Sequence, residues 1–153
     1  MQHKLEFTVH IRRPVSVVYD HLAQPTNFIG LQPLLTSISS VQEIYVNNKR
    51  GYKYETVETF RIGPIPVLNN RIRVQTVLTE LDQQIDSVVQ SKPKIRLDVH
   101  YQFTSLADET DVVEQMLTSA PAWVSGYVVR TARQVQEQTL ANLKRRLENS
   151  GAV

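Results

Sequence analysis

Hydrophobic and polar residues alternate with a period of two through most of this chain. The clearest run is Ile95 to Phe103, where apolar or aromatic side chains take every second position. Leu5 to Ile11 repeats the pattern near the N-terminus. This period is typical of β-strands that bury one face and expose the other. We expect seven strands, at residues 5–11, 36–47, 52–62, 67–81, 85–90, 95–103 and 110–119.

The last stretch, Ala122 to Asn149, has a helical period instead. Apolar residues recur there at spacings of three and four, which predicts one long amphipathic helix of about 40 Å. Pro121 suits the first turn of this helix, and the cations Lys144 to Arg146 suit its carboxyl end. The expected buried stripe is Val124, Val128, Ala132, Val135, Thr139, Leu143 and Leu147.

The connections complete the predicted order of elements. Pro14 should end the first strand and open a short helix at 15–23, and a second helical turn is expected between Pro25 and Gly30. Tight turns are expected at 48–51, where Gly51 supplies positive φ, and at 63–66, 92–94 and 107–110. Only residues 1–3 and 150–153 should be loose. Strands joined in this way predict an antiparallel meander and an α+β fold.

Composition narrows the class of protein. A chain of 153 residues with 41% hydrophobic and 21% charged residues is expected to form a single domain, 1–153. The net charge of +2 does not call for nucleic acid, and the absence of cysteine excludes disulfides and thiolate chemistry. No apolar run reaches a membrane span, and the N-terminus does not resemble a signal peptide, so a cytoplasmic location is expected.

The order of elements resembles a known superfamily. The segment Val15 to Leu22 after the first strand, the following Gln24 to Phe28, and the terminal amphipathic helix are similar to the helix-grip fold. This fold is shared by START-related, birch-pollen-allergen-like and polyketide cyclase/dehydrase-like (SRPBCC) proteins. The resemblance implies a curved seven-stranded antiparallel sheet wrapped around the long helix, with two short helices between the first two strands. It also implies a deep apolar cavity for lipids, quinones, polyketides or other aromatic metabolites.

Two carboxylates fall on the inward parity of their strands. Glu58 shares its parity with Tyr52 and Tyr54, and a carboxylate in an apolar cavity would have a raised pKa and could act as an acid or base. The alternative is that a bulge turns Glu58 outward. Glu114 raises the same question, but Val113 and Leu117 compete for the inward face of that strand. Glu58 is therefore the candidate catalytic residue.

Aromatic side chains are the other candidate ligand contacts. Tyr52, Tyr54, Tyr101, Trp123 and Tyr127 combine an apolar ring with a polar tip. Trp123 and Tyr127 lie one turn apart at the amino end of the long helix, where the cavity mouth is expected beside residues 63–66 and 92–94. Packing in the core or at its rim is the alternative for each ring.

The sequence contains no pattern typical of a metal site, a catalytic nucleophile or a phosphate-binding loop. The histidines have no metal-ligand spacing, no serine has the context of a nucleophile, and no glycine-rich phosphate loop is present, so no metal or cofactor is expected. Arg71, Arg73, Lys92, Lys94 and Arg96 are scattered cations for which a solvated surface is the ordinary explanation.

Three hypotheses remain for the function. The first is a non-catalytic binder of a hydrophobic small molecule. The second is a cyclase, aromatase or dehydratase that uses Glu58 or a tyrosine hydroxyl in the same cavity. The third is a protein-interaction module whose interior is only a packed core. The ligand and the oligomeric state are left open by the sequence.

Overall fold

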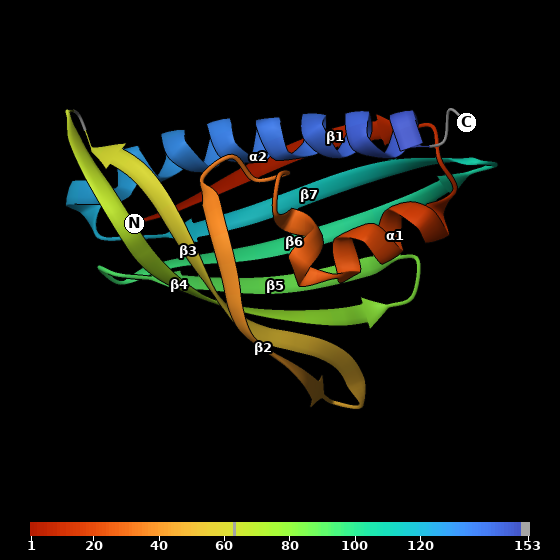
Figure 1. Ribbon diagram of the computed structural model, residues 1–153, viewed down its shortest axis with the longest axis horizontal. Helices are drawn as coiled ribbons and strands as arrows, with labels where there is room; N and C mark the ends of the chain where they lie inside the picture. Colours follow the sequence, from red (N-terminus) through yellow and green to blue (C-terminus); the bar gives the residue numbers. More distant parts are fainter. Residues whose placement is uncertain (63, 151–153) are drawn as a thin grey trace.

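The seven predicted strands form one antiparallel sheet in a computed structural model of the chain, which describes residues 1–62 and 64–150, with the side chains of all but 60–62 and 65–69. The strand order is β1-β7-β6-β5-β4-β3-β2, so only β1 lies out of sequence order, at the edge beside β7. The predicted α+β architecture is confirmed (Figure 1). The strands are β1 (Gln2–Ile11), β2 (Leu35–Val46), β3 (Lys49–Ile62), β4 (Ile65–Glu80), β5 (Gln84–Ser91), β6 (Ile95–Leu106) and β7 (Glu109–Ser119).

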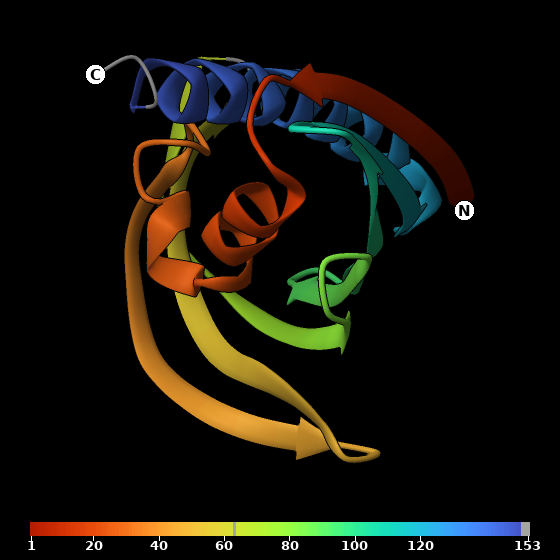
Figure 2. The same cartoon turned by 90° about the vertical axis from the view of Figure 1, so that its right-hand side faces the viewer.

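The sheet is strongly curved. Figure 2 shows it from the end, where it curls around α1 (Val15–Ala23) with α2 (Ala122–Ser150) closing the opening. Irregularities in strand pairing occur in β2, in β3 after Glu58, and in β4 after Val77. Bulges of this kind bend a strand and increase its twist, which lets a single sheet enclose an interior.

The long helix matches its prediction. α2 begins at Ala122 as expected and ends at Ser150, and it packs mainly against β1 and β7. The seven predicted stripe residues are all buried. Thr139, the one polar member, is satisfied because its hydroxyl donates to the carbonyl of Val135 at 2.7 Å. The apolar period of the sequence thus determines which face of α2 meets the sheet.

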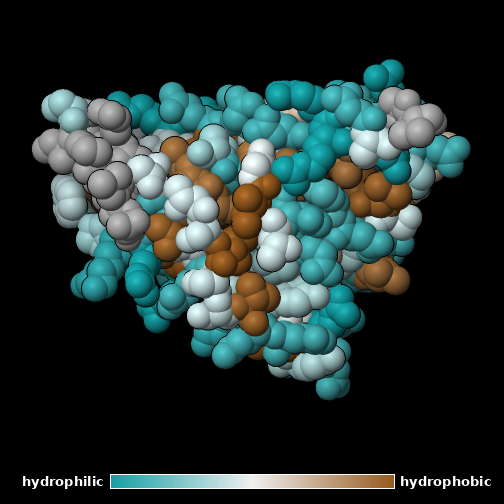
Figure 3. Space-filling view, viewed as in Figure 1, coloured by the Kyte–Doolittle hydropathy of each residue, from teal (hydrophilic) through white to brown (hydrophobic). Residues whose placement is uncertain are grey.

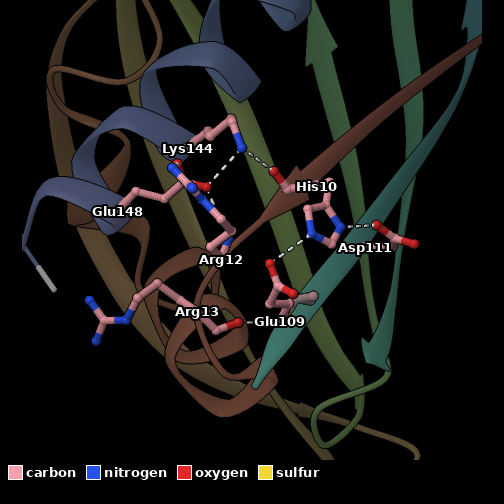
Figure 4. Close-up of polar contacts among 8 residues, drawn as sticks. His10, Arg12, Arg13, Glu109, Asp111, Lys144 and Glu148 are labelled. Atoms are coloured by element: carbon pink, nitrogen blue, oxygen red, sulfur yellow. Dashed lines mark hydrogen bonds and ion pairs between the residues drawn. The ribbon is translucent and has the colours of Figure 1, made fainter. Parts of the chain in front are cut away.

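Polar contacts fix the carboxyl end of α2 to the end of β1. Lys144 Nζ donates to the carbonyl of His10 at 2.6 Å and to Glu148 Oε2 at 2.7 Å. Glu148 also accepts from the backbone N–H of Arg12 at 2.9 Å (Figure 4). Arg13 donates to the carbonyl of Leu147 at 2.9 Å. These bonds hold the helix over the opening of the sheet.

The segment between β1 and β2 is fixed to the same helix. The α1 helix is followed by a 3₁₀ turn, η1 (Pro25–Phe28), where the second short helical turn was expected. Arg146 of α2 donates to the carbonyls of Asn27 at 2.7 Å and Ile29 at 3.0 Å. Asn142 donates to the carbonyl of Leu31 at 2.8 Å. These contacts set the position of the residues that follow, which enter the interior.

Two details of the sequence prediction are wrong. The β2–β3 turn is formed by Asn47 and Asn48, both with positive φ, while Gly51 lies inside β3. Asparagine tolerates this conformation, so glycine is not needed in the turn. Gly51 instead permits close approach of β4, since a Cβ there would lie 2.2 Å from the Thr76 carbonyl oxygen.

The N-terminus is also ordered, contrary to the prediction. β1 begins at Gln2, and the Met1 amine donates to the carbonyl of Ala120 at 2.8 Å. The free edge of β7 supplies partners for these first residues as far as Ser119. Of the other predicted loose end, 150–153, Ser150 is the last residue of α2. Residues 151–153 lie outside the described residues, as does Gly63 of a predicted turn.

Candidate functional site

An inner cavity lies between α2 and the concave face of β3 to β6. It consists of two adjoining lobes of about 120 Å³ each. The lobe nearer the helix lies between the sheet and the α2 residues Tyr127, Val128, Ala132 and Val135. The lobe nearer the sheet extends toward Phe28, beneath η1. Both lobes are lined by Gln32, Glu58, Ile72, Val89, Leu97 and Gln136.

The cavity is mainly apolar, and apolar side chains also reach the surface beside it. Figure 3 shows them gathered in the middle of the face where β2, η1 and α2 meet. A larger hollow of about 480 Å³ lies elsewhere, on the outer face of the sheet, but Lys4, Glu6, Asp86, Asp98 and His100 give it a charged lining. The inner cavity is the better candidate site, because small-molecule sites are usually apolar with a few placed polar groups.

Glu58 is one of these polar groups, and the structure places it in the lining of both lobes. Gln32 Nε2 donates to Glu58 Oε1 at 2.6 Å, while Gln32 Oε1 accepts from the backbone N–H of Leu34 at 2.9 Å. Burial raises the pKa of the Glu58 carboxyl, and the hydrogen bond from Gln32 opposes part of this rise. The hydrogen bond from Gln32 thus fixes the orientation of the Glu58 carboxyl in apolar surroundings, where it is suited to hydrogen bonding or proton transfer.

Glu114 also points inward, which decides between the two orientations left open by the sequence. It pairs with Phe7 of β1 and Tyr101 of β6, both buried, and its exposed fraction is 0%. With its nitrogen facing the carboxyl, the amide of Gln136 donates to both Glu114 oxygens at 3.1 and 3.2 Å. Burial raises the pKa of Glu114 to about 8, so the carboxyl is mostly protonated at neutral pH. Glu114 lies behind the lining, and Gln136 connects it to the cavity.

Three of the five aromatic candidates line the cavity. Tyr54 and Tyr101 are buried in the sheet-side lobe, and Tyr127 lines the helix-side lobe. Burial raises the pKa of the Tyr101 hydroxyl well above its ordinary value, and the nearby Glu114 adds to the rise. Burial also raises the pKa of Tyr54, against a hydrogen bond with Thr76 that lowers it. Both hydroxyls therefore stay protonated and are available as donors.

The other two rings lie outside the lining. Tyr52 packs beside Tyr54 in a small cluster, with the Arg50 guanidinium 5.7 Å from its ring centroid. Trp123 is 78% exposed, because the neighbouring Val124 and Ser125 take the inward face of α2. Trp123 is thus absent from the lining of both lobes, and its expected place at the cavity mouth stays a prediction.

Sequence reasoning missed the two glutamines. Gln136 follows Val135 and lies one helical turn after Ala132, so it borders the buried stripe, which is a signal the sequence contained. Gln32 lies in an irregular segment between Gly30 and Pro33, and no periodicity could place it. These amides matter because each one holds a carboxyl in the interior.

Residues 1–62 and 64–150 contain no group of three or more histidine, aspartate and glutamate side chains that could hold a metal ion. None of the helices within them is long and apolar enough to cross a membrane.

Comparison with known proteins rests on structure. No protein-family profile matches the chain, and no curated protein sequence matches it. A START superfamily protein from Mycobacterium smegmatis superposes with a TM-score of 0.70 at 12% identity, over 96% of this chain and 98% of that one. The di-domain ARO/CYC protein StfQ of the steffimycin biosynthetic pathway gives 0.75 at 14% identity, over 100% of this chain and 53% of that one.

A third structure matches this chain from end to end. The Zhui aromatase/cyclase from a Streptomyces species superposes with a TM-score of 0.67 at 14% identity, and the match covers 100% of both chains. At such identities the likeness concerns the fold alone. The chain therefore has the helix-grip fold found in START superfamily proteins and in polyketide aromatase/cyclases.

Proposed function

We propose that this protein binds a small hydrophobic molecule that carries one or more polar groups, and that the inner cavity is the binding site. The observation that carries the proposal is the pair of apolar lobes between the sheet and α2, both lined by Glu58. Apolar side chains in the wall of a cavity favour the binding of an apolar molecule. A few fixed polar groups in the same wall set the orientation of that molecule.

The size of the lobes limits the ligand. An apolar protein cavity of roughly 150 Å³ accepts one benzene ring. Each lobe of about 120 Å³ is close to that size. We therefore infer a ligand with one or two fused or linked rings, or a chain of similar volume. Larger ligands would require the helix-side lobe to widen.

The polar lining indicates what the ligand carries. A protonated Glu58 can donate to a carbonyl or hydroxyl, and the hydroxyls of Tyr54 and Tyr101 lie in the same lobe. Gln32 holds Glu58 in place, so the donor is oriented before the ligand binds. An aromatic ketone or phenol satisfies these groups better than a hydrocarbon of the same shape.

Filling the cavity is the direct test. Ala132→Phe should fill the helix-side lobe, because Ala132 is buried in its lining, whereas Ala141→Phe adds the same ring on the exposed face of α2. A panel of one- and two-ring phenols and ketones would be screened by thermal shift and calorimetry. A ligand at a hundred times its Kd adds about 2.7 kcal/mol of stability, which is easily measured.

The expected result is binding to the unsubstituted protein and to Ala141→Phe, and at least a tenfold loss in Ala132→Phe. Equal binding by all three proteins would place the ligand outside the cavity. Absence of any stabilising compound across phenols, ketones, quinones and fatty acids would count against the proposal itself. In that case the interaction-module hypothesis would gain.

A second candidate function is catalysis in the same cavity. The observation that favours it is the Gln32-oriented Glu58, an acid held in the lining near two tyrosine hydroxyls. General acid–base catalysis of a cyclisation or dehydration needs such a group in contact with the substrate. Glu58→Gln would lower turnover of a poly-β-ketone analogue by orders of magnitude and leave its binding nearly unchanged if Glu58 is the acid or base. Equal turnover in the variant would exclude Glu58 from the chemistry.

A further inference from the structure

A second hollow lies outside the sheet, at the end where β5 turns into β6. Its volume is about 870 Å³, and its lining comes from β3, β4, β5, β6 and the turn between the last two. Asn70, Ser91 and Ile95 line both this outer hollow and the helix-side lobe of the inner cavity. Asn70 Nδ2 donates to Ser91 Oγ at 3.3 Å along this shared border. The hollow and the cavity therefore share part of their lining.

The outer hollow is strongly cationic. Glu55 is the single acidic residue in its lining, against Arg71, Arg73, Lys92, Lys94 and Arg96. The pairing register places Arg73 opposite Gln90, and Gln90 opposite Arg96, so the cations cross three strands on the same face. We call this set of five residues the cationic rim.

Part of this charge lacks a protein counter-ion. Arg71 lies 3.9 Å from Glu55, and Arg96 lies 2.9 Å from Asp98. In the part of the chain that the structure describes, Arg73, Lys92 and Lys94 have no carboxylate within 4.0 Å. The neighbouring stretch 60–69 contains no acidic residue in the sequence. Like charges gathered at one place repel each other, and an anion between them would relieve that repulsion.

An ordinary solvated surface does not account for the position of this charge. The cations gather beside the residues that the outer hollow shares with the apolar cavity, and this shared border is formed by two small polar side chains and Ile95. A molecule that extends from the cavity across this border passes from apolar surroundings to a cationic surface. Such a molecule must therefore have one apolar end and one anionic end.

We propose that the ligand is an amphipathic anion, whose apolar part occupies the inner cavity and whose carboxylate, sulfonate or phosphate lies on the cationic rim. This inference rests on the proposed function and names the ligand class. Arg73, Lys92 and Lys94 hold the anionic group, and Asn70 and Ser91 contact the part between. Charge-assisted bonds from arginine and lysine suit these anions. The inner end of the ligand still meets Glu58.

The test compares two fluorescent probes with one apolar body. Naphthalene-2-sulfonate carries an anionic group, and naphthalene is the same two-ring system without it. The unsubstituted protein should bind the sulfonate at least tenfold more tightly at about 0.1 M NaCl. The preference should disappear at about 1 M NaCl, because the screening length falls from roughly 10 Å to roughly 3 Å. Each probe should displace the other, since both occupy the cavity.

Substitutions in the cationic rim test whether these residues cause the preference for the anionic probe. The triple change Arg73→Gln, Lys92→Gln and Lys94→Gln should reduce the sulfonate affinity about tenfold and leave the neutral probe unchanged. The matched control removes three exposed cations elsewhere, by Lys49→Gln, Lys53→Gln and Arg130→Gln. This control should keep the preference for the anion, and circular dichroism would show that both variants are folded.

Several outcomes would overturn the inference. Equal affinity for the two probes, or an unchanged preference in the rim variant, contradicts a role for the rim. If the neutral probe cannot displace the sulfonate, the sulfonate is bound on the surface only, and its apolar part does not occupy the inner cavity. Rim-dependent binding to phosphatidylglycerol vesicles without any preference between the probes would assign the rim to a membrane surface instead. If neither probe binds, the proposed function fails first, and the inference fails with it.

Discussion

Gln136 of α2 lies against the fully buried Glu114 of β7, with its amide within 3.2 Å of both carboxyl oxygens. This contact joins the helix to the sheet at the inner cavity, because Gln136 also belongs to the lining. A carboxyl with so little exposure is stable mainly in its neutral form. The contact therefore makes the stability of the fold depend on pH.

The first prediction concerns this pH dependence. The pKa of Glu114 is raised from 4.5 to about 8, so between these values the unfolded chain releases the proton while the folded protein keeps it. Stability should fall as pH rises through this window, by at most about 1.4 kcal/mol per pH unit. In Glu114→Gln this fall should be absent. Urea unfolding at pH 4.5, 6 and 8 measures it, and identical pH profiles for both proteins would refute the assignment.

The second prediction concerns the carboxyl end of α2, where the pH effect has the opposite sign. Lys144 and Arg12 lower the pKa of Glu148 from 4.5 to about 2 (Figure 4). The stability that these bonds provide is complete above pH 4.5 and is lost as pH falls toward 2. Glu148→Gln should cost about 1–3 kcal/mol at neutral pH and flatten the acid limb of the stability profile.

The exposed Glu137 on the same helix offers a control for this change. Glu137→Gln should alter stability by less than about 0.5 kcal/mol, since it removes a surface charge only. If both variants lose the same stability, the contacts of Glu148 are no stronger than an ordinary surface interaction.

The third prediction compares two glycines. A Cβ at Gly51 would lie 2.2 Å from the Thr76 carbonyl oxygen and 3.1 Å from Val77 Cα, so Gly51→Ala should force β3 and β4 apart. The expected loss is roughly 2–4 kcal/mol. Gly126→Ala should instead stabilise the protein by about 1 kcal/mol, because a Cβ there meets nothing within 4 Å and alanine favours the helix. Thermal unfolding of both variants checks the pair, and a stable Gly51→Ala protein would contradict the close approach.

The fourth prediction concerns ligand binding at Glu58. Burial raises the pKa of Glu58, so this carboxyl takes up a proton at higher pH than an ordinary glutamate, and its protonated form can donate to a ligand carbonyl. Affinity for an aromatic ketone should therefore decrease as pH rises, while affinity for the parent hydrocarbon stays constant. Glu58→Gln keeps a donor at this position, so it should bind the ketone with no pH dependence. Calorimetric titrations across pH 5 to 8 test this, and equal pH profiles for the ketone and the hydrocarbon would exclude the contact.

Much of the fold could be predicted from the chain because local periodicity reports burial directly. The alternation at Ile95 to Phe103 and the stripe from Val124 to Leu147 each mark the buried face of one element, and both agree with the structure. Local patterns also placed Pro14 and the start of α2 correctly. The turn at Asn47 and Asn48 was not placed correctly, because the prediction assigned the positive φ to Gly51.

The candidate site depended on contacts between distant parts of the chain. Glu58 was identified from its parity, but Glu114 was left undecided until its neighbours Phe7 and Tyr101 fixed the face of β7. Gln32 meets Glu58 because α2 holds the segment before it, and no local signal contains that information. Trp123 was named as a ligand contact, but it precedes the buried Val124 on α2, and this position on the helix puts its ring in solvent.

The sequence by itself thus determined the order of strands and helices, the buried face of each, and the class of fold, because these follow from the spacing of apolar residues. The tertiary structure decided which polar groups enter the cavity and which surface adjoins it. Curvature of the sheet and the position of α2 bring together residues from β3, β7 and α2. Their meeting is a property of strand pairing and packing, which no single stretch of the chain records.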